Sequence, residues 1–273
     1  MDHLANNRFE LFKELLRYRF LDLFLCSLCL SLFLIPDLAF NVFIQDLFIN
    51  ENYFLNYVLI YSIKIIFFMI FGLGVSGALY FFKRLTFGEG ASVRRDFFHG
   101  IRQNYKQFLF IYFILGFFYA LIQINSSVMF ETFEEGSMIP TISVGLSYGF
   151  YMLLVVVSFF MQTQAVLYKA TLRQLFVNGV RFLIGHFFKN ILIFIVTMFP
   201  YILIEFIGNE IVRYVCLLVY VLGYFSISLL IINLYSNSVY DKTINKDYPE
   251  LVRRGIKKWL KYYLLMMENI LFP

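Results

Sequence analysis

Long uninterrupted apolar runs are the feature that most constrains how this chain can fold. A helix needs about 20 apolar residues to cross the roughly 30 Å hydrocarbon core of a bilayer. The runs are continuous, whereas membrane-spanning strands alternate apolar and polar residues. The sequence therefore predicts an all-α polytopic membrane bundle of six transmembrane helices. The predicted spans are Phe20–Ile35 (with a continuation past Pro36 left open), Tyr57–Phe82, Phe108–Met129, Thr141–Leu167, Ile191–Ile207 and Val212–Leu234.

Composition excludes the main soluble classes. The chain is 60% apolar and 15% charged, whereas soluble domains are about 45–50% apolar and about 25% charged. Its three cysteines all lie within apolar runs, which argues against a disulfide scaffold. The first run is not expected to be a cleavable signal peptide, because 19 mixed residues precede it and no small-x-small cleavage site follows.

The basic residues predict the orientation of the chain. Of the 23 Lys and Arg residues, 21 fall in the N-terminal arm, the second and fourth loops and the C-terminal tail. The other loops carry mainly acidic residues. By the positive-inside rule both termini are expected in the cytoplasm. The net charge of +5 is then a membrane-surface property and no indication of nucleic-acid binding.

These signals predict three regions. Residues 1–19 form a cytoplasmic amphipathic arm, and residues 20–235 form the six-helix domain, including cytoplasmic loops 83–107 and 168–190. Residues 236–273 form a basic amphipathic tail. The arm, the two loops and the tail are predicted to contain interfacial helices that lie in the headgroup plane. Docking of the same helices into a partner's groove is the alternative.

A short pattern recurs in the cytoplasmic segments. Phe97-x-x-Gly100-Ile101-Arg102 returns as Phe176-x-x-Gly179-Val180-Arg181, and more loosely as Val252-x-x-Gly255-Ile256-Lys257. A steady period of this kind is typical of repeated helix–hairpin units. The alternative is that basic amphipathic helices entering a membrane share this pattern without duplication.

Three sequence patterns match functional motifs but are better explained by helix packing or by burial in an apolar run than by a catalytic, nucleotide-binding or redox site. Gly72-x-Gly74-x-x-Gly77 resembles a dinucleotide fingerprint but lies inside a predicted span, where small residues let helices approach closely. Gly145-x-Ser147-x-Gly149 matches a nucleophile elbow but lies far from His99 and His186, so small-residue packing is again expected. Cys26-x-x-Cys29 is embedded in apolar residues that do not activate a thiol.

No catalytic, cofactor-binding or metal-binding group is predicted. The remaining chemical candidate is an intramembrane charge pair, because ionisable residues inside a bilayer are functional candidates by default. Lys64 and Glu205 fall at similar depth in spans two and five, which suggests an ion pair. The alternative is that both side chains reach the outer interface independently.

One stretch carries a family resemblance. Gly77-Ala78-Leu79-Tyr80, Lys83-Arg84-Leu85-Thr86-Phe87-Gly88-Glu89-Gly90 and Arg95-Asp96-Phe97-Phe98-x-Gly100-Ile101-Arg102-x-Asn104-Tyr105-Lys106-Gln107 together resemble the YesL-like family of bacterial integral membrane proteins. The resemblance is sharpest over residues 74–108. It implies a bacterial plasma-membrane location and an association with carbohydrate ABC-transporter systems.

The predicted function follows from the resemblance and from the absence of an ATP-binding motif in the sequence. The sequence has no Walker A motif, so it is not the transporter's ATPase. We expect a non-enzymatic accessory or regulatory subunit, with a self-sufficient small-solute transporter or channel as the alternative. The expected partners are the lipid bilayer and sugar ABC-transporter subunits. The predicted partner-binding residues are Gly88, Gly90, Asp96, Phe97, Phe98, Arg102, Tyr105 and Lys106.

Overall fold

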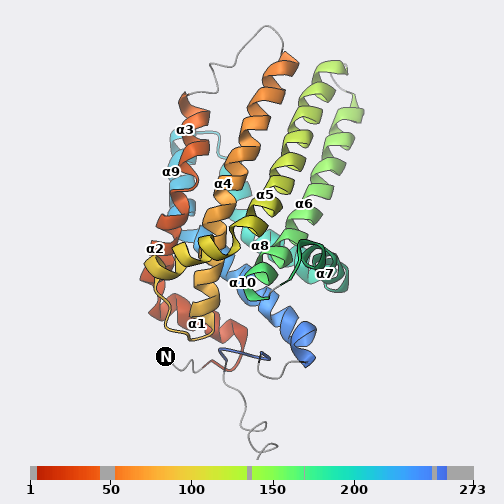
Figure 1. The fold of residues 1–273 in the computed structure, drawn as a ribbon. Helices are drawn as coiled ribbons and strands as arrows, with labels where there is room; N and C mark the ends of the chain where they lie inside the picture. The colour runs from red at the N-terminus through yellow and green to blue at the C-terminus, as the bar shows by residue number, and fades with distance from the viewer. Residues whose placement is uncertain (1–4, 44–52, 134–136, 169, 248–250, 257–273) are drawn as a thin grey trace, which may run out of the picture.

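The structure is a computed structural model that describes residues 5–43, 53–133, 137–168, 170–247 and 251–256. Within these ranges it is an all-α bundle with no strand, as predicted (Figure 1). The helices are α1 (Arg8–Tyr18), α2 (Phe20–Ser31), α3 (Ile35–Phe43), α4 (Tyr53–Thr86), α5 (Val93–Thr132), α6 (Met138–Leu167), α7 (Leu172–Gly185), α8 (Phe187–Glu205), α9 (Glu210–Val219), the π-helical turn η2 (Tyr220–Tyr224), α10 (Phe225–Lys242) and the 3-10 turn η3 (Ile244–Asp247).

The apolar helices match the predicted spans in number. In the part of the chain that the structure describes, five helices are long and apolar enough to cross a membrane, and the bent pair α2–α3, taken as one span, makes a sixth candidate. Helix α4 has 34 residues and α5 has 40. At about 1.5 Å per residue they are roughly 50 and 60 Å long, well beyond the roughly 30 Å of hydrocarbon. Part of each helix therefore extends outside the bilayer.

The first span is broken. Helices α2 and α3 meet at an angle of 49° across residues 32–34, and the chain continues past Pro36 in α3. Proline has no N–H, and its ring clashes with the carbonyl four residues earlier, which here belongs to Leu32. The break therefore follows from Pro36.

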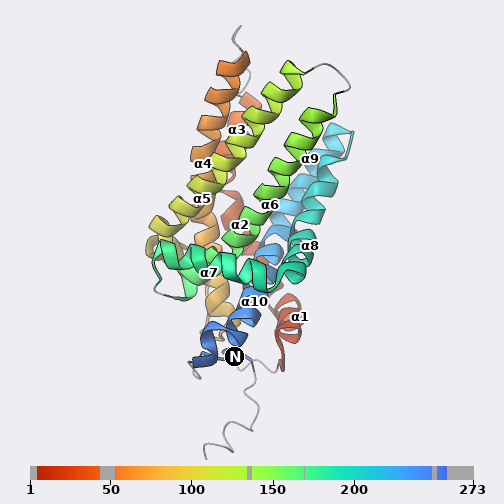
Figure 2. The ribbon, with the colours of Figure 1, turned by 90° about the vertical axis from the view of Figure 1, so that its right-hand side faces the viewer.

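One end of the bundle carries the short segments between and beside the long helices (Figures 1 and 2). We call it the basic end; it consists of helices α1 and α7, the turn between α4 and α5 (residues 87–92) and the last turns of α10. Figure 2 shows α7 running across the axes of the long helices. Helix α7 begins with a capping box between Thr171 and Gln174, and its Leu175, Gly179 and Phe182 are buried. The predicted amphipathic helix in loop 168–190 is therefore present.

The helix predicted in loop 83–107 is present as the start of α5. Residues 93–107 are the first turns of α5 and continue without a break into the span. In Figure 1 these turns (yellow) cross α4 obliquely before α5 rises along it. Only residues 87–92 form a loop, because Gly88 and Gly90 adopt positive φ angles of 72° and 66° that favour glycine.

The predicted boundary between the bundle and the tail is wrong. Helix α10 continues to Lys242, and its Ser236 and Tyr240 are fully buried in the bundle. The predicted tail helix does not begin at Val252, because residues 251–256 form turns. Residues 257–273, which carry the rest of that predicted helix, lie outside the described residues.

Glycines set the spacing of the central helices. A Cβ atom at Gly77 would lie 2.7 Å from the carbonyl oxygen of Phe97, and one at Gly72 would lie 2.5 Å from the Tyr112 ring. The predicted packing role of the Gly72–Gly77 pattern is thus confirmed. The same prediction for Gly145 and Gly149 is wrong, because nothing in the described part of the chain lies within 4 Å of a Cβ placed at either residue.

Candidate functional site

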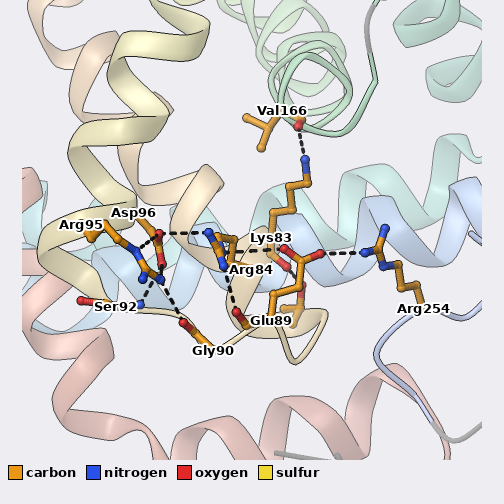
Figure 3. A network of polar contacts seen from close by, with 10 residues as sticks. Lys83, Arg84, Glu89, Gly90, Ser92, Arg95, Asp96, Val166 and Arg254 are labelled. Atoms are coloured by element: carbon orange, nitrogen blue, oxygen red, sulfur yellow. Dashed lines mark hydrogen bonds and ion pairs between the residues drawn. The ribbon is translucent and has the colours of Figure 1, made fainter.

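A buried carboxylate organises the turn between α4 and α5 (Figure 3). Asp96 accepts hydrogen bonds from the Ser92 backbone N–H (2.8 Å) and from Arg95 Nε (3.0 Å). It also accepts a longer one from Arg84 Nη1 at 3.4 Å. The Asp96 side chain is 1% exposed. A buried carboxylate is stable only when it is paired and hydrogen-bonded in this way.

The charge state of Asp96 follows from these contacts. Asp96 lies three turns before Phe108, where the apolar part of α5 begins, and so outside the predicted span. Burial alone raises the pKa of this carboxyl. The hydrogen bonds from Arg95 and Ser92 and the charge of Arg84 outweigh burial, so the pKa of Asp96 lies below its usual value. Asp96 is therefore a permanent anion at neutral pH.

A second carboxylate links this turn to the C-terminal segment. Glu89 forms ion pairs with Arg84 (3.7 Å) and with Arg254 (2.9 Å). The Arg254 guanidinium also lies 5.0 Å from the centre of the Phe87 ring. Lys83 donates to the Val166 carbonyl at 2.9 Å, which satisfies a free carbonyl at the end of α6.

The N-terminal helix joins the same network. Arg8, at the start of α1, pairs with Asp241 of α10 at 2.8 Å. Arg8 also donates to the Arg254 carbonyl, and the Arg253 backbone N–H donates to Asp241. These contacts hold α1, α10 and residues 251–256 together at the basic end. The predicted N-terminal arm is therefore packed on the bundle, with Leu11 and Leu15 buried.

The predicted partner-binding residues divide into two groups. Asp96 and Phe97 are buried, so their predicted roles as a charged contact and an apolar anchor for a partner are wrong. Both instead hold α5 against α4. The other four predicted side chains are exposed along the outer side of α5: Phe98, Arg102, Tyr105 and Lys106.

We call this set of four the α5 face. An open depression adjoins it, lined by Ser92, Arg94, Arg95, Phe98, His99 and Arg102. Within the described residues neither Arg94 nor Arg102 has an ion-pair partner. The α5 face thus combines unneutralised positive charge with exposed aromatic rings. This combination suits an anionic surface that also offers apolar contact.

The repeated pattern has a common packing role in its first two copies. A Cβ at Gly100 would meet Ser76 and Tyr80 of α4, and one at Gly179 would meet Val157 of α6. In each copy the glycine docks its helix on the preceding long helix. In the third copy Gly255 lies in a turn with φ 80° and abuts Thr86. The third copy is therefore not a helical unit of the same kind.

The predicted Lys64–Glu205 pair stays a prediction, because the side chain of Glu205 lies outside the described part of the structure. The Lys64 ammonium lies 5.5 Å from the centre of the Tyr61 ring. Lys64 also interacts electrostatically with Asp37 of α3. Lys64 therefore has a neighbouring carboxylate that sequence reasoning did not consider.

Sequence reasoning also missed a buried polar set on α10. Tyr235 donates to Asn190 of α8 at 2.6 Å, and the Tyr240 and Thr163 hydroxyls lie 2.6 Å apart between α10 and α6. Part of the signal was present, because Ser236 and Asn237 follow Asn233 at three and four residues, which is the spacing of one helix face. The buried polar residues of α10 are Ser226, Ser228, Asn233, Ser236 and Asn237.

The comparisons with known proteins do not assign the chain to a family. No protein-family model, no curated protein and no solved structure matches the chain. Among the described residues no group of three or more His, Cys, Asp or Glu side chains is placed to hold a metal ion. The fold itself defines the class: the chain is an all-α membrane protein with several membrane-spanning helices.

Proposed function

We propose that this chain is a non-enzymatic accessory or regulatory subunit of a membrane complex. In this proposal the α5 face is the surface that contacts the partner. The observation that carries it is the exposure of Phe98, Arg102, Tyr105 and Lys106 on one rigid helix. Aromatic residues and arginine are the side chains that most often dominate binding energy at protein interfaces.

The surroundings of the α5 face support this proposal. Asp96 and Phe97 fix the same helical turns from the inner side, so the exposed residues need little ordering when a partner binds. The repeat offers a contrast, because α7 carries Val177 and Arg181 exposed at the positions that correspond to Phe98 and Arg102, without the buried carboxylate network. A specific partner site is therefore expected on α5 rather than on α7.

The location and partner class are part of the proposal. We place the chain in a bacterial plasma membrane, with the basic end and both termini in the cytoplasm. The distribution of Lys and Arg supports this orientation. The YesL-like resemblance of residues 74–108 supports the bacterial location and sugar ABC-transporter subunits as partners.

Site-specific photo-crosslinking in native membranes tests the contact surface. A benzophenone amino acid at Tyr105, which is 43% exposed, is expected to give a discrete protein adduct. The same probe at Phe113, equally exposed two turns further into the apolar part of α5, serves as the matched control and is expected to give lipid adducts only. Lipid adducts alone at both positions would contradict the proposal.

A self-sufficient small-solute transporter is the second candidate. It is favoured by three helix irregularities: α2 ends at a 49° bend, α8 contains Pro200, and a π-helical turn separates α9 from α10. Transporter sites are typically built where membrane helices are discontinuous. Solute flux by the purified chain in liposomes would support this candidate over the accessory function.

A further inference from the structure

One hairpin of the bundle has an irregular backbone at each of its two ends. Residues 201–219 comprise the last turn of α8, a short connection and α9. Pro200 precedes this hairpin, and the π-helical turn Tyr220–Tyr224 follows it. Kinks in helices occur at prolines and at π-bulges. The hairpin is therefore flanked by two points at which the helix axes can bend.

The two irregular points are joined by a hydrogen bond. Pro200 has no N–H, so the carbonyl of Val196 loses the donor that an unbroken helix would supply. The Tyr224 hydroxyl donates to this carbonyl at 2.8 Å. The π-helical turn thus supplies from the neighbouring helix the hydrogen bond that Pro200 removes from α8. Just beyond this bond, the ring centres of Tyr201 and Tyr220 lie 6.0 Å apart.

Beyond the π-helical turn the chain is firmly anchored. The Ser226 backbone N–H donates to Ser27 Oγ at 3.2 Å, and Ser226 Oγ donates to the Leu23 carbonyl at 2.9 Å. Ser228 donates to the carbonyl of Thr197 in α8 at 3.3 Å. These contacts tie the start of α10 to α2 and α8. The base of the hairpin therefore has a fixed pivot.

The hairpin itself is loosely packed. Apart from the π-helical turn that continues it along the chain, helix α9 packs mainly on α8. Four of its apolar side chains are about half exposed or more: Val212, Val215, Leu218 and Val219. Segments with few buried contacts open at lower free energy than the core of the same protein.

We infer that residues 201–219 form a hinged hairpin held closed by the hydrogen bond from Tyr224 to the Val196 carbonyl. When this bond is intact, the hairpin keeps one position relative to the rest of the bundle. When it breaks, the hairpin moves as a unit about Pro200 and the π-helical turn. The inference depends neither on the accessory function nor on the transporter alternative.

Spin-label distances test the hinge. One label is placed on the native Cys216 in α9 and the other on Leu146→Cys in α6, in a Cys29→Ala background where Cys26 is fully buried. The doubly labelled protein is measured in lipid nanodiscs by pulsed electron resonance. Tyr224→Phe is expected to broaden the distance distribution relative to the unsubstituted tyrosine.

Two further variants make the result specific. Tyr235→Phe is the matched control, because it removes another hydroxyl that links α10 to α8. This hydroxyl lies nearer the basic end than the hinge does. Tyr235→Phe is expected to leave the distribution unchanged. Pro200→Ala restores the donor to Val196, so Tyr224→Phe is expected to have no effect in that background. An unchanged distribution in Tyr224→Phe, or equal broadening with and without Pro200, would overturn the inference.

Discussion

Replacing Gly77 with alanine tests the close contact between α4 and α5. The new Cβ would lie 2.7 Å from the Phe97 carbonyl oxygen and 2.9 Å from the Phe97 ring. Backbone atoms cannot rotate away, so the two helices must separate by several tenths of an ångström. Overpacking of this kind costs about 1–3 kcal/mol. Replacing glycine by alanine within a helix recovers about 1 kcal/mol.

Gly145→Ala is the matched control, since it gains the same helix propensity but its Cβ meets nothing within 4 Å in the described structure. The free energies of unfolding of the two variants should therefore differ by about 1–3 kcal/mol. At roughly 2–4 °C per kcal/mol, Gly77→Ala should melt several degrees below Gly145→Ala. Thermal unfolding of both variants in the same detergent measures this difference. Equal or reversed melting temperatures would refute the packing argument.

Two further predictions concern the basic end. Asp96→Asn should lower the stability by about 2 kcal/mol at neutral pH, because charged hydrogen bonds to Arg95 and Arg84 are lost. Since the pKa of Asp96 is lowered by folding, this advantage should shrink as pH falls below about 4, and a constant difference from pH 7 to 3 would contradict it. Thr171→Ala removes the capping box of α7 and should cost about 1 kcal/mol, with faster hydrogen exchange in residues 172–176 as the local readout.

The spans could be predicted because apolar length is a local property of the sequence. The side of α5 that packs on α4 could not be predicted, because helical periodicity alone does not say which of residues 93–107 face a neighbouring helix. Only tertiary structure distinguishes these residues: Phe97 is buried because Gly77 allows α4 to approach it. Likewise Asp96 looks like an exposed contact until Arg84, twelve residues earlier, is brought beside it.

Hydropathy also did not predict that α10 continues within the bundle beyond the last apolar run. After Leu234 the polarity rises with Ser236 and Asn237, which predicts an exit from the membrane, yet both side chains are buried among other helices. A hydropathy scale does not distinguish water from a polar neighbour on another helix. Pro36 indicates the break in the first span, and Pro200 indicates a missing backbone hydrogen bond within α8. The π-helical turn at Tyr220–Tyr224 has no comparable signal in its residues.

The most direct test of the central claim is quantitative co-purification from native membranes in a mild detergent. The proposed accessory function predicts a stoichiometric partner that is lost with Phe98→Ala plus Arg102→Ala. The partner should be retained with Phe176→Ala plus Arg181→Ala, which remove an exposed phenylalanine and an exposed arginine from α7. A homo-oligomer without other subunits, or equal partner recovery in both double variants, would contradict the claim that the α5 face binds a partner.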